Sequence, residues 1–194
     1  MIEFLKNIDT QLFLFFNGIH GPIGDFVMYW LSDKYIWIPL YAFLLYLLFR
    51  YYGKKAFILM VLVALLITIS DQVSVHLFKN VFQRLRPCHE PALEGMVYTL
   101  GRCGGKFGFI SSHASNSFAI AVFMALLLWK NLRVMAIIML VWAAMVSYSR
   151  VYLGVHYPGD ILVGGMVGAL EAIMVYSLWL IIPKSGFSKR PSGV

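Results

Sequence analysis

The chain has 194 residues, of which 60% are hydrophobic and only 13% are charged. In soluble domains about a quarter of the residues are usually charged. This composition therefore excludes an ordinary soluble protein and indicates a chain embedded in a bilayer. The length fits one domain of about 100 to 200 residues. The net charge of +7 indicates basic cytoplasmic loops and no nucleic-acid partner, because basic residues of membrane proteins collect in those loops.

Residues 1–34 form the first segment, which is predicted to consist of short helices lying in, or partly inserted into, the outer membrane interface. Two short apolar runs in this segment are interrupted between Asn17 and Asp25 by polar residues, glycines and Pro22. Glycine and proline are strong breakers outside a continuous spanning pattern. A sixth full span is the alternative.

Five longer apolar segments follow within residues 35–183, the predicted membrane bundle. They cover residues 35–49, 56–70, 107–129, 134–149 and 161–183. A spanning helix needs about 20 mostly apolar residues, and shorter runs are tolerated when flanking residues reach the interface. The predicted fold class is therefore all-α, a polytopic membrane bundle with five to six transmembrane helices. Residues 184–194 are predicted to be a basic cytoplasmic tail.

The loops of such a bundle differ in charge between its two ends. Following the chain through the spans puts eight basic residues and no acidic residue at one end: Arg50, Lys54, Lys55, Lys130, Arg133, Lys184, Lys189 and Arg190. The positive-inside rule makes that end cytoplasmic. The long loop 80–110 and the short loop 151–159 then face outward.

Three polar clusters fall on this outward end. The first is Lys79 with Arg86 and Pro87, the second is Ser111, Ser112 and His113, and the third is Ser149, Arg150, His156 and Asp160. Three cations at one pocket are costly unless an anion joins them, and phosphate suits both the planar fork of arginine and the point charge of lysine. A helix predicted to begin near Ser112 adds free backbone N–H groups and the positive end of its dipole. Lys79, Arg86, Ser111, Ser112 and Arg150 are therefore predicted to bind phosphate.

The two histidines have different predicted roles. His156 and Asp160 are four residues apart near a helix start, so the carboxylate can orient the imidazole and stabilise positive charge on it. His156 is then the candidate nucleophile, and His113 is the candidate general acid that protonates the departing oxygen. A structural hydrogen-bonding role is the alternative for a single intramembrane histidine, and interfacial snorkelling is the alternative for a single cation.

At these residues the sequence resembles the type-2 phosphatidic acid phosphatase superfamily. The family pattern Lys-x6-Arg-Pro matches from Lys79 to Pro87, and Ser-Arg-x5-His-x3-Asp matches from Ser149 to Asp160. The middle element departs from the family pattern, because Ile110 and Ser112 replace the usual proline and glycine, while Ser111 and His113 match.

This resemblance implies a hydrolase that forms a phosphohistidine on His156 without a metal or other cofactor. It also implies a multi-pass protein of the bacterial inner membrane whose site faces the periplasm. The stretch from Ser149 to His156 looks like the bacterial undecaprenyl pyrophosphate phosphatase branch, which makes that lipid the expected substrate. Lipid A phosphatases and phosphatidylglycerophosphate phosphatases share the three motifs and are alternatives. If the protein is not an enzyme, the alternative is an anion transporter.

Cys88 and Cys103 are the only two cysteines, and both lie in the long outward loop. An oxidising compartment would favour a disulfide between them. The alternative is a metal site with His89, which lacks the further ligands that a closed zinc site needs.

Overall fold

The computed structural model describes residues 2–101 and 103–182, and the helices below account for most of them. The α-helices are α1 (Ile2–Gly18), α2 (Pro22–Ser32), α3 (Ile38–Tyr52), α4 (Ala56–Gln72), α5 (Asn80–Phe82), α6 (Ser112–Leu128), α7 (Arg133–Tyr152) and α8 (Pro158–Ile181). A π-helical stretch, η3 (Val73–Lys79), links α4 to α5, and short 3-10 turns cover Tyr35–Trp37, Gly53–Lys55, Pro87–His89 and Pro91–Leu93. The described residues contain no strand, only an isolated bridge between Leu85 and Phe107.

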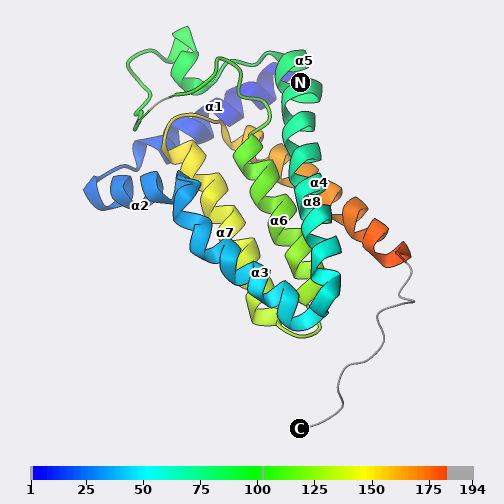
Figure 1. Cartoon of the computed structure of the whole chain (residues 1–194). Coiled ribbons are helices and arrows are strands. Elements are labelled where there is room, and N and C mark those ends of the chain that lie inside the picture. The colour runs from blue at the N-terminus through cyan, green and yellow to red at the C-terminus, as the bar shows by residue number, and fades with distance from the viewer. Residues whose placement is uncertain (1, 102, 183–194) are drawn as a thin grey trace.

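Five apolar helices, α3, α4, α6, α7 and α8, form the bundle (Figure 1). Helix α6 packs against α4, α7 and α8 and so supplies its centre. Large apolar side chains such as Phe123 and Leu128 are fully buried there, whereas others such as Val134 and Met174 are exposed on the outside. An apolar exterior around an apolar core is expected for a protein whose surroundings are lipid, and this confirms the predicted all-α membrane bundle.

Among the residues that the structure describes, three helical stretches are long and apolar enough to cross a membrane: Tyr35–Phe82, Arg133–Tyr152 and Pro158–Ile181. The first reverses direction at Gly53, whose φ of 54° suits glycine, so it contains both α3 and α4. Helix α6 is also apolar but shorter. The predicted segments therefore agree with the bundle helices to within a few residues at their ends.

Helices α6 and α8 approach each other closely because α8 carries glycines at the contact. A Cβ atom added at Gly164 would come within 2.8 Å of the Ser111 carbonyl oxygen, and one added at Gly168 would collide with the backbone of Ser115. Small residues allow this close backbone approach in membrane bundles. The packing brings the N-terminal ends of the two helices together, where the backbone N–H of Ser111 donates to the carbonyl of Asp160 at 3.1 Å.

Helices α1 and α2 lie at the end of the bundle that also carries the long loop (Figure 1). Asn17, at the end of α1, donates to the carbonyls of Tyr98 and Tyr152, each at 2.8 Å, and accepts from the Tyr98 N–H at 2.8 Å. Neither helix is among the stretches able to cross a membrane. Their position in the outer interface stays a prediction, and the predicted tail 184–194 lies outside the described residues.

Candidate active site

The three polar clusters meet at the end of the bundle that the N-terminal helices cover. Lys79 ends the π-helical stretch η3, a type of helix that is rare and frequently found at functional sites. Its ammonium donates to the hydroxyl of Ser112 at 2.6 Å. The backbone bond between Ser111 and Asp160 joins the second cluster to the third.

His156 and Asp160 form a buried pair at the start of α8. Nδ1 of His156 lies 3.2 Å from Oδ2 of Asp160, and the two residues are 1% and 0% exposed. His156 itself lies just before α8, which begins at Pro158, so the pair is formed by a loop residue and a residue of the first helical turn. Oδ2 also accepts the backbone N–H of Tyr157 at 3.0 Å, which fixes the carboxylate as part of the helix cap.

Arg86 lies on the opposite side of the His156 ring. Its Nη1 is 3.2 Å from Nε2 of His156, and it also donates to the carbonyl of Val155 at 3.5 Å. Because a guanidinium can only donate, Nε2 must accept and the ring proton must sit on Nδ1, facing Asp160. This tautomer leaves the Nε2 lone pair directed at Arg86.

The charge state of His156 follows from its surroundings. Burial, followed by the positive charges of Arg86, Arg150 and Lys79, holds its pKa well below the ordinary value of 6.5. The imidazole is therefore neutral at neutral pH. A neutral, oriented imidazole is the form that can act as a nucleophile.

Arg86 and Arg150 retain unused hydrogen-bonding capacity. Nη1 of Arg150 donates to the hydroxyl of Ser32 in α2. Within the described part of the chain, the buried Nε atoms of both arginines have no hydrogen-bond partner. Buried charged donors without a partner are costly, and an anion bound between them would satisfy them.

The three predicted residues at the start of α6 have different surroundings. Ser111 is fully buried and is the N-cap, with its hydroxyl accepting from the N–H of Ala114 at 3.4 Å. Ser112 contacts Lys79 as described above, while His113 lies in the first helical turn with an exposed side chain. An exposed histidine at the start of α6 is accessible to a substrate.

Arg84 and Asp9 belong to the same network and were not among the predicted site residues. Arg84 donates to Oδ1 of Asp160 at 3.1 Å and to Oδ2 of Asp9 at 2.8 Å, and its guanidinium lies 3.8 Å from the centre of the Tyr157 ring. Asp9, in α1, also accepts the N–H of Gly159 at 2.7 Å. Arg84 could have been predicted from the sequence, because it lies two residues before Arg86. Nothing in the sequence links Asp9 to residues 150 positions away.

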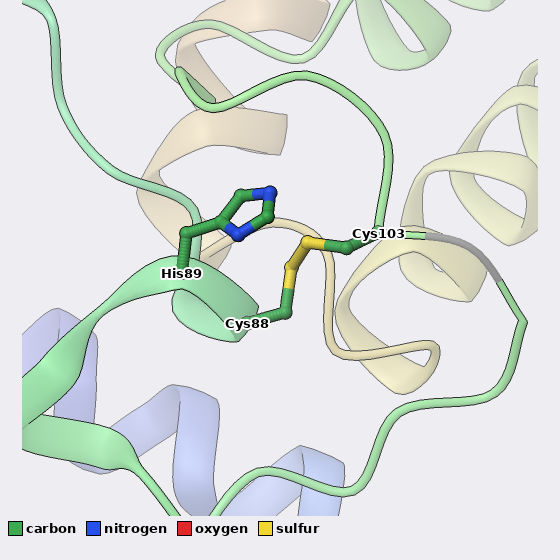
Figure 2. Close-up of side chains that lie close together, drawn as sticks. All are labelled: Cys88, His89 and Cys103. Atoms are coloured by element: carbon green, nitrogen blue, oxygen red, sulfur yellow. A yellow bond between two sulfur atoms is a disulfide. The ribbon is translucent and has the colours of Figure 1, made fainter.

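The cysteines lie in the loop that carries Arg86. Figure 2 shows the Cys88 and Cys103 sulfurs bonded to each other, with His89 beside them. The Cα atoms are 6.2 Å apart, within the usual range for a disulfide. His89 and the two cysteines are close enough for their donor atoms to share a metal ion, but sulfurs paired with each other are not thiolate ligands.

Comparison with known proteins assigns the chain to a family. Residues 56–182 match the PAP2 superfamily. Lipid A 4'-phosphatase from Bacteroides thetaiotaomicron is 45% identical over 179 residues, covering 91% of this chain and 79% of the relative. Undecaprenyl-diphosphatase from Sulfolobus acidocaldarius is 28% identical over 168 residues, covering 87% of this chain and 73% of the relative.

A solved structure has the same fold. The crystal structure of a transmembrane PAP2 type phosphatidylglycerolphosphate phosphatase from Bacillus subtilis superposes with a TM-score of 0.74 at 24% identity, covering 93% of this chain and 89% of that one. The family match over residues 56–182 and the 45% identity with the Bacteroides relative show that the chain belongs to the PAP2 superfamily and is an integral-membrane phosphatase of lipid phosphate esters.

Proposed function

We propose that this phosphatase removes a phosphate from a sugar of a lipid A type glycolipid. The observation that carries the chemistry is the buried, neutral His156, oriented by Asp160 with Nε2 directed at Arg86. The choice of lipid rests on the 45% identity with a relative named lipid A 4'-phosphatase, against 28% with an undecaprenyl-diphosphatase. This differs from the substrate expected from the sequence, undecaprenyl pyrophosphate, which becomes the second candidate.

The proposed reaction has two steps. Nε2 of His156 attacks phosphorus, so that a P–N bond forms while the P–O bond to the sugar breaks, and His113 gives its proton to the departing oxygen. A water molecule then attacks phosphorus, His113 takes a proton from it, and the P–N bond breaks. Inorganic phosphate leaves and both histidines return to their starting forms.

The cations act on the transferring phosphoryl group in both steps. Arg86 already contacts Nε2 of His156 and can move its donors to a phosphate oxygen when substrate binds. Lys79, Arg150 and the N-terminus of α6 with Ser111 and Ser112 are proposed to bind the other phosphate oxygens. Preorganised positive charge of this kind lowers the barrier most when it meets charge that develops in the transition state.

The site is proposed to face the periplasm across the bacterial inner membrane. In the described chain the α3–α4 turn, with Lys54 and Lys55, and the α6–α7 turn, with Lys130, lie at the bundle end opposite the candidate site (Figure 1). The positive-inside rule makes that end cytoplasmic.

The test is phosphate release by the purified protein from four lipids in mixed micelles: lipid A bisphosphate, undecaprenyl diphosphate, phosphatidylglycerophosphate and phosphatidic acid. We expect the highest kcat/KM with lipid A and no release by the His156→Ala protein. A higher kcat/KM with undecaprenyl diphosphate would overturn the proposed substrate. Full activity of His156→Ala would overturn the proposed mechanism.

A further inference from the structure

A small cavity adjoins the phosphate-binding cations on the side of α2. Its volume is about 140 Å³, and its walls include Tyr29, Ser32 and Asp33 from α2 and its end, Gly101 from the long loop, and Arg150 from α7. Arg150 also donates to the hydroxyl of Ser32. The cavity and the proposed phosphate site therefore share one side chain.

The walls of this cavity are held together by hydrogen bonds on Asp25 of α2. Its two carboxylate oxygens accept from the hydroxyls of Tyr98 and Tyr152, each at 2.8 Å, so that α2, the long loop and the end of α7 are joined at one point. The bond from Tyr152, followed by that from Tyr98, lowers the pKa of Asp25 below its ordinary value. The carboxylate is thus ionised at neutral pH, and the cavity has a defined shape before a ligand binds.

The size and lining of the cavity suit one polar six-membered ring. A cavity of about 150 Å³ in another protein holds one benzene ring, which sets the scale. Asp33 uses Oδ1 to accept the N–H of Tyr35 at 2.6 Å, so its second oxygen can accept from a hydroxyl or amide of a ligand. Tyr29 is 47% exposed although it lies on the cavity wall, which leaves part of its side chain free to contact the apolar side of a ring.

We propose that this cavity receives the sugar ring that bears the phosphate to be removed, with Asp33 accepting from its polar substituents and Tyr29 packing against it. The inference rests on the proposed function and extends it by naming the residues that select a glycolipid. Arg150 lies between the ring and the reacting phosphorus. A polyprenyl or diacylglycerol phosphate has no ring next to its phosphate and leaves the cavity without a ligand.

The experiment compares two substrates across two pocket variants, Asp33→Asn and Tyr29→Ala. With lipid A we expect kcat/KM to fall about tenfold or more for each variant, as expected when a hydrogen bond to a charged group or a ring contact is lost. With phosphatidic acid we expect kcat/KM within about twofold of wild type, because loss of one surface contact leaves the chemistry intact. The second substrate also verifies that each variant is folded.

Matched controls change an acidic residue and a tyrosine that lie away from the cavity. Glu94→Gln and Tyr46→Ala alter exposed side chains of the loop and of α3, and both should leave the ratio of the two activities unchanged. Tyr29→Phe keeps the ring and should restore the ratio toward that of wild type.

The outcomes separate this inference from the proposed function. Wild-type protein that hydrolyses phosphatidic acid but not lipid A would overturn the proposed function. Wild-type protein that prefers lipid A, with pocket variants that lose both activities equally or neither, would overturn the inference about the cavity alone.

Discussion

At the scale of single residues, Asp160 accepts more hydrogen bonds than it needs to orient the His156 ring. Its Oδ2 serves His156 and the Tyr157 N–H, while Oδ1 accepts from Arg84, which Asp9 holds from the other side. The carboxylate is completely buried, so each of these donors compensates for water that it has lost. The angle that Asp160 presents to His156 therefore depends on Arg84, a residue that need not touch the substrate.

Arg84→Gln tests this positioning role. We expect kcat to fall about 10- to 100-fold, as it does when a residue that orients a metal-binding side chain is lost, with KM nearly unchanged because the phosphate-binding cations remain. Arg84→Lys should recover part of the loss. The control is Lys106→Gln, which removes an exposed cation from the same loop. A rise in KM with unchanged kcat would show instead that Arg84 binds substrate.

The pH dependence of the reaction follows from His156. Its pKa in the folded protein is depressed, so the ring stays neutral as pH falls through 6.5 and takes up a proton only at lower pH. We expect the acidic limb of kcat/KM to lie below pH 6.5. Arg86→Gln removes the largest electrostatic cause of the depression and should move that limb to higher pH while lowering the rate. A limb at or above pH 6.5 in the unaltered protein would contradict this explanation.

At the scale of elements, the sequence predicts the bundle better than it predicts the supports of the site. Apolar runs bounded by short basic turns locate the bundle helices, and the Ser111 cap marks the start of α6. The contacts of Asp9 and Asn17 could not be predicted, because they join α1 to residues distant in sequence. Their partners are mostly backbone groups, which every residue carries and which leave no sequence pattern.

The long loop gives a prediction at the same scale. Cys88 lies two residues after Arg86, and the backbone N–H of Arg86 donates to the carbonyl of Lys106, three residues beyond Cys103. A Cys88–Cys103 disulfide would close a loop of 15 residues. Both of its ends lie close in sequence to the backbone hydrogen bond between Arg86 and Lys106 that positions Arg86. Replacing both cysteines by serine should lower the free energy of unfolding by about 3 kcal/mol or less, by raising the entropy of the unfolded chain.

The same double variant should keep most of its kcat below its melting temperature, because neither cysteine contacts the catalytic pair. Thermal unfolding followed with and without reductant measures the stability change. Mass analysis of unreduced peptides measures the pairing itself, and two free thiols in protein from an oxidising compartment would reject it. Phosphate release by the serine variant provides the activity measurement.

At the scale of the whole molecule, the two ends of the bundle are chemically different. The candidate site end combines cations with acidic groups such as Asp9, Asp25 and Asp160, which neutralise much of its charge locally. The turn formed by Gly53–Lys55 has two basic residues and no acidic one. Orientation in the membrane should therefore follow that turn and its counterpart between α6 and α7, because local excess of Lys and Arg sets topology.

Accessibility labelling tests this orientation. In a background with Cys88 and Cys103 replaced by serine, we introduce Glu94→Cys in the long loop or Lys54→Cys in the α3–α4 turn, both exposed positions. A maleimide that cannot cross membranes should label Glu94→Cys in intact spheroplasts and Lys54→Cys only after the membrane is permeabilised. This result is expected because moving basic loops outward opposes both the membrane potential and the anionic inner leaflet. Labelling of Lys54→Cys in intact spheroplasts, with Glu94→Cys protected, would reverse the orientation and place phosphate release in the cytoplasm.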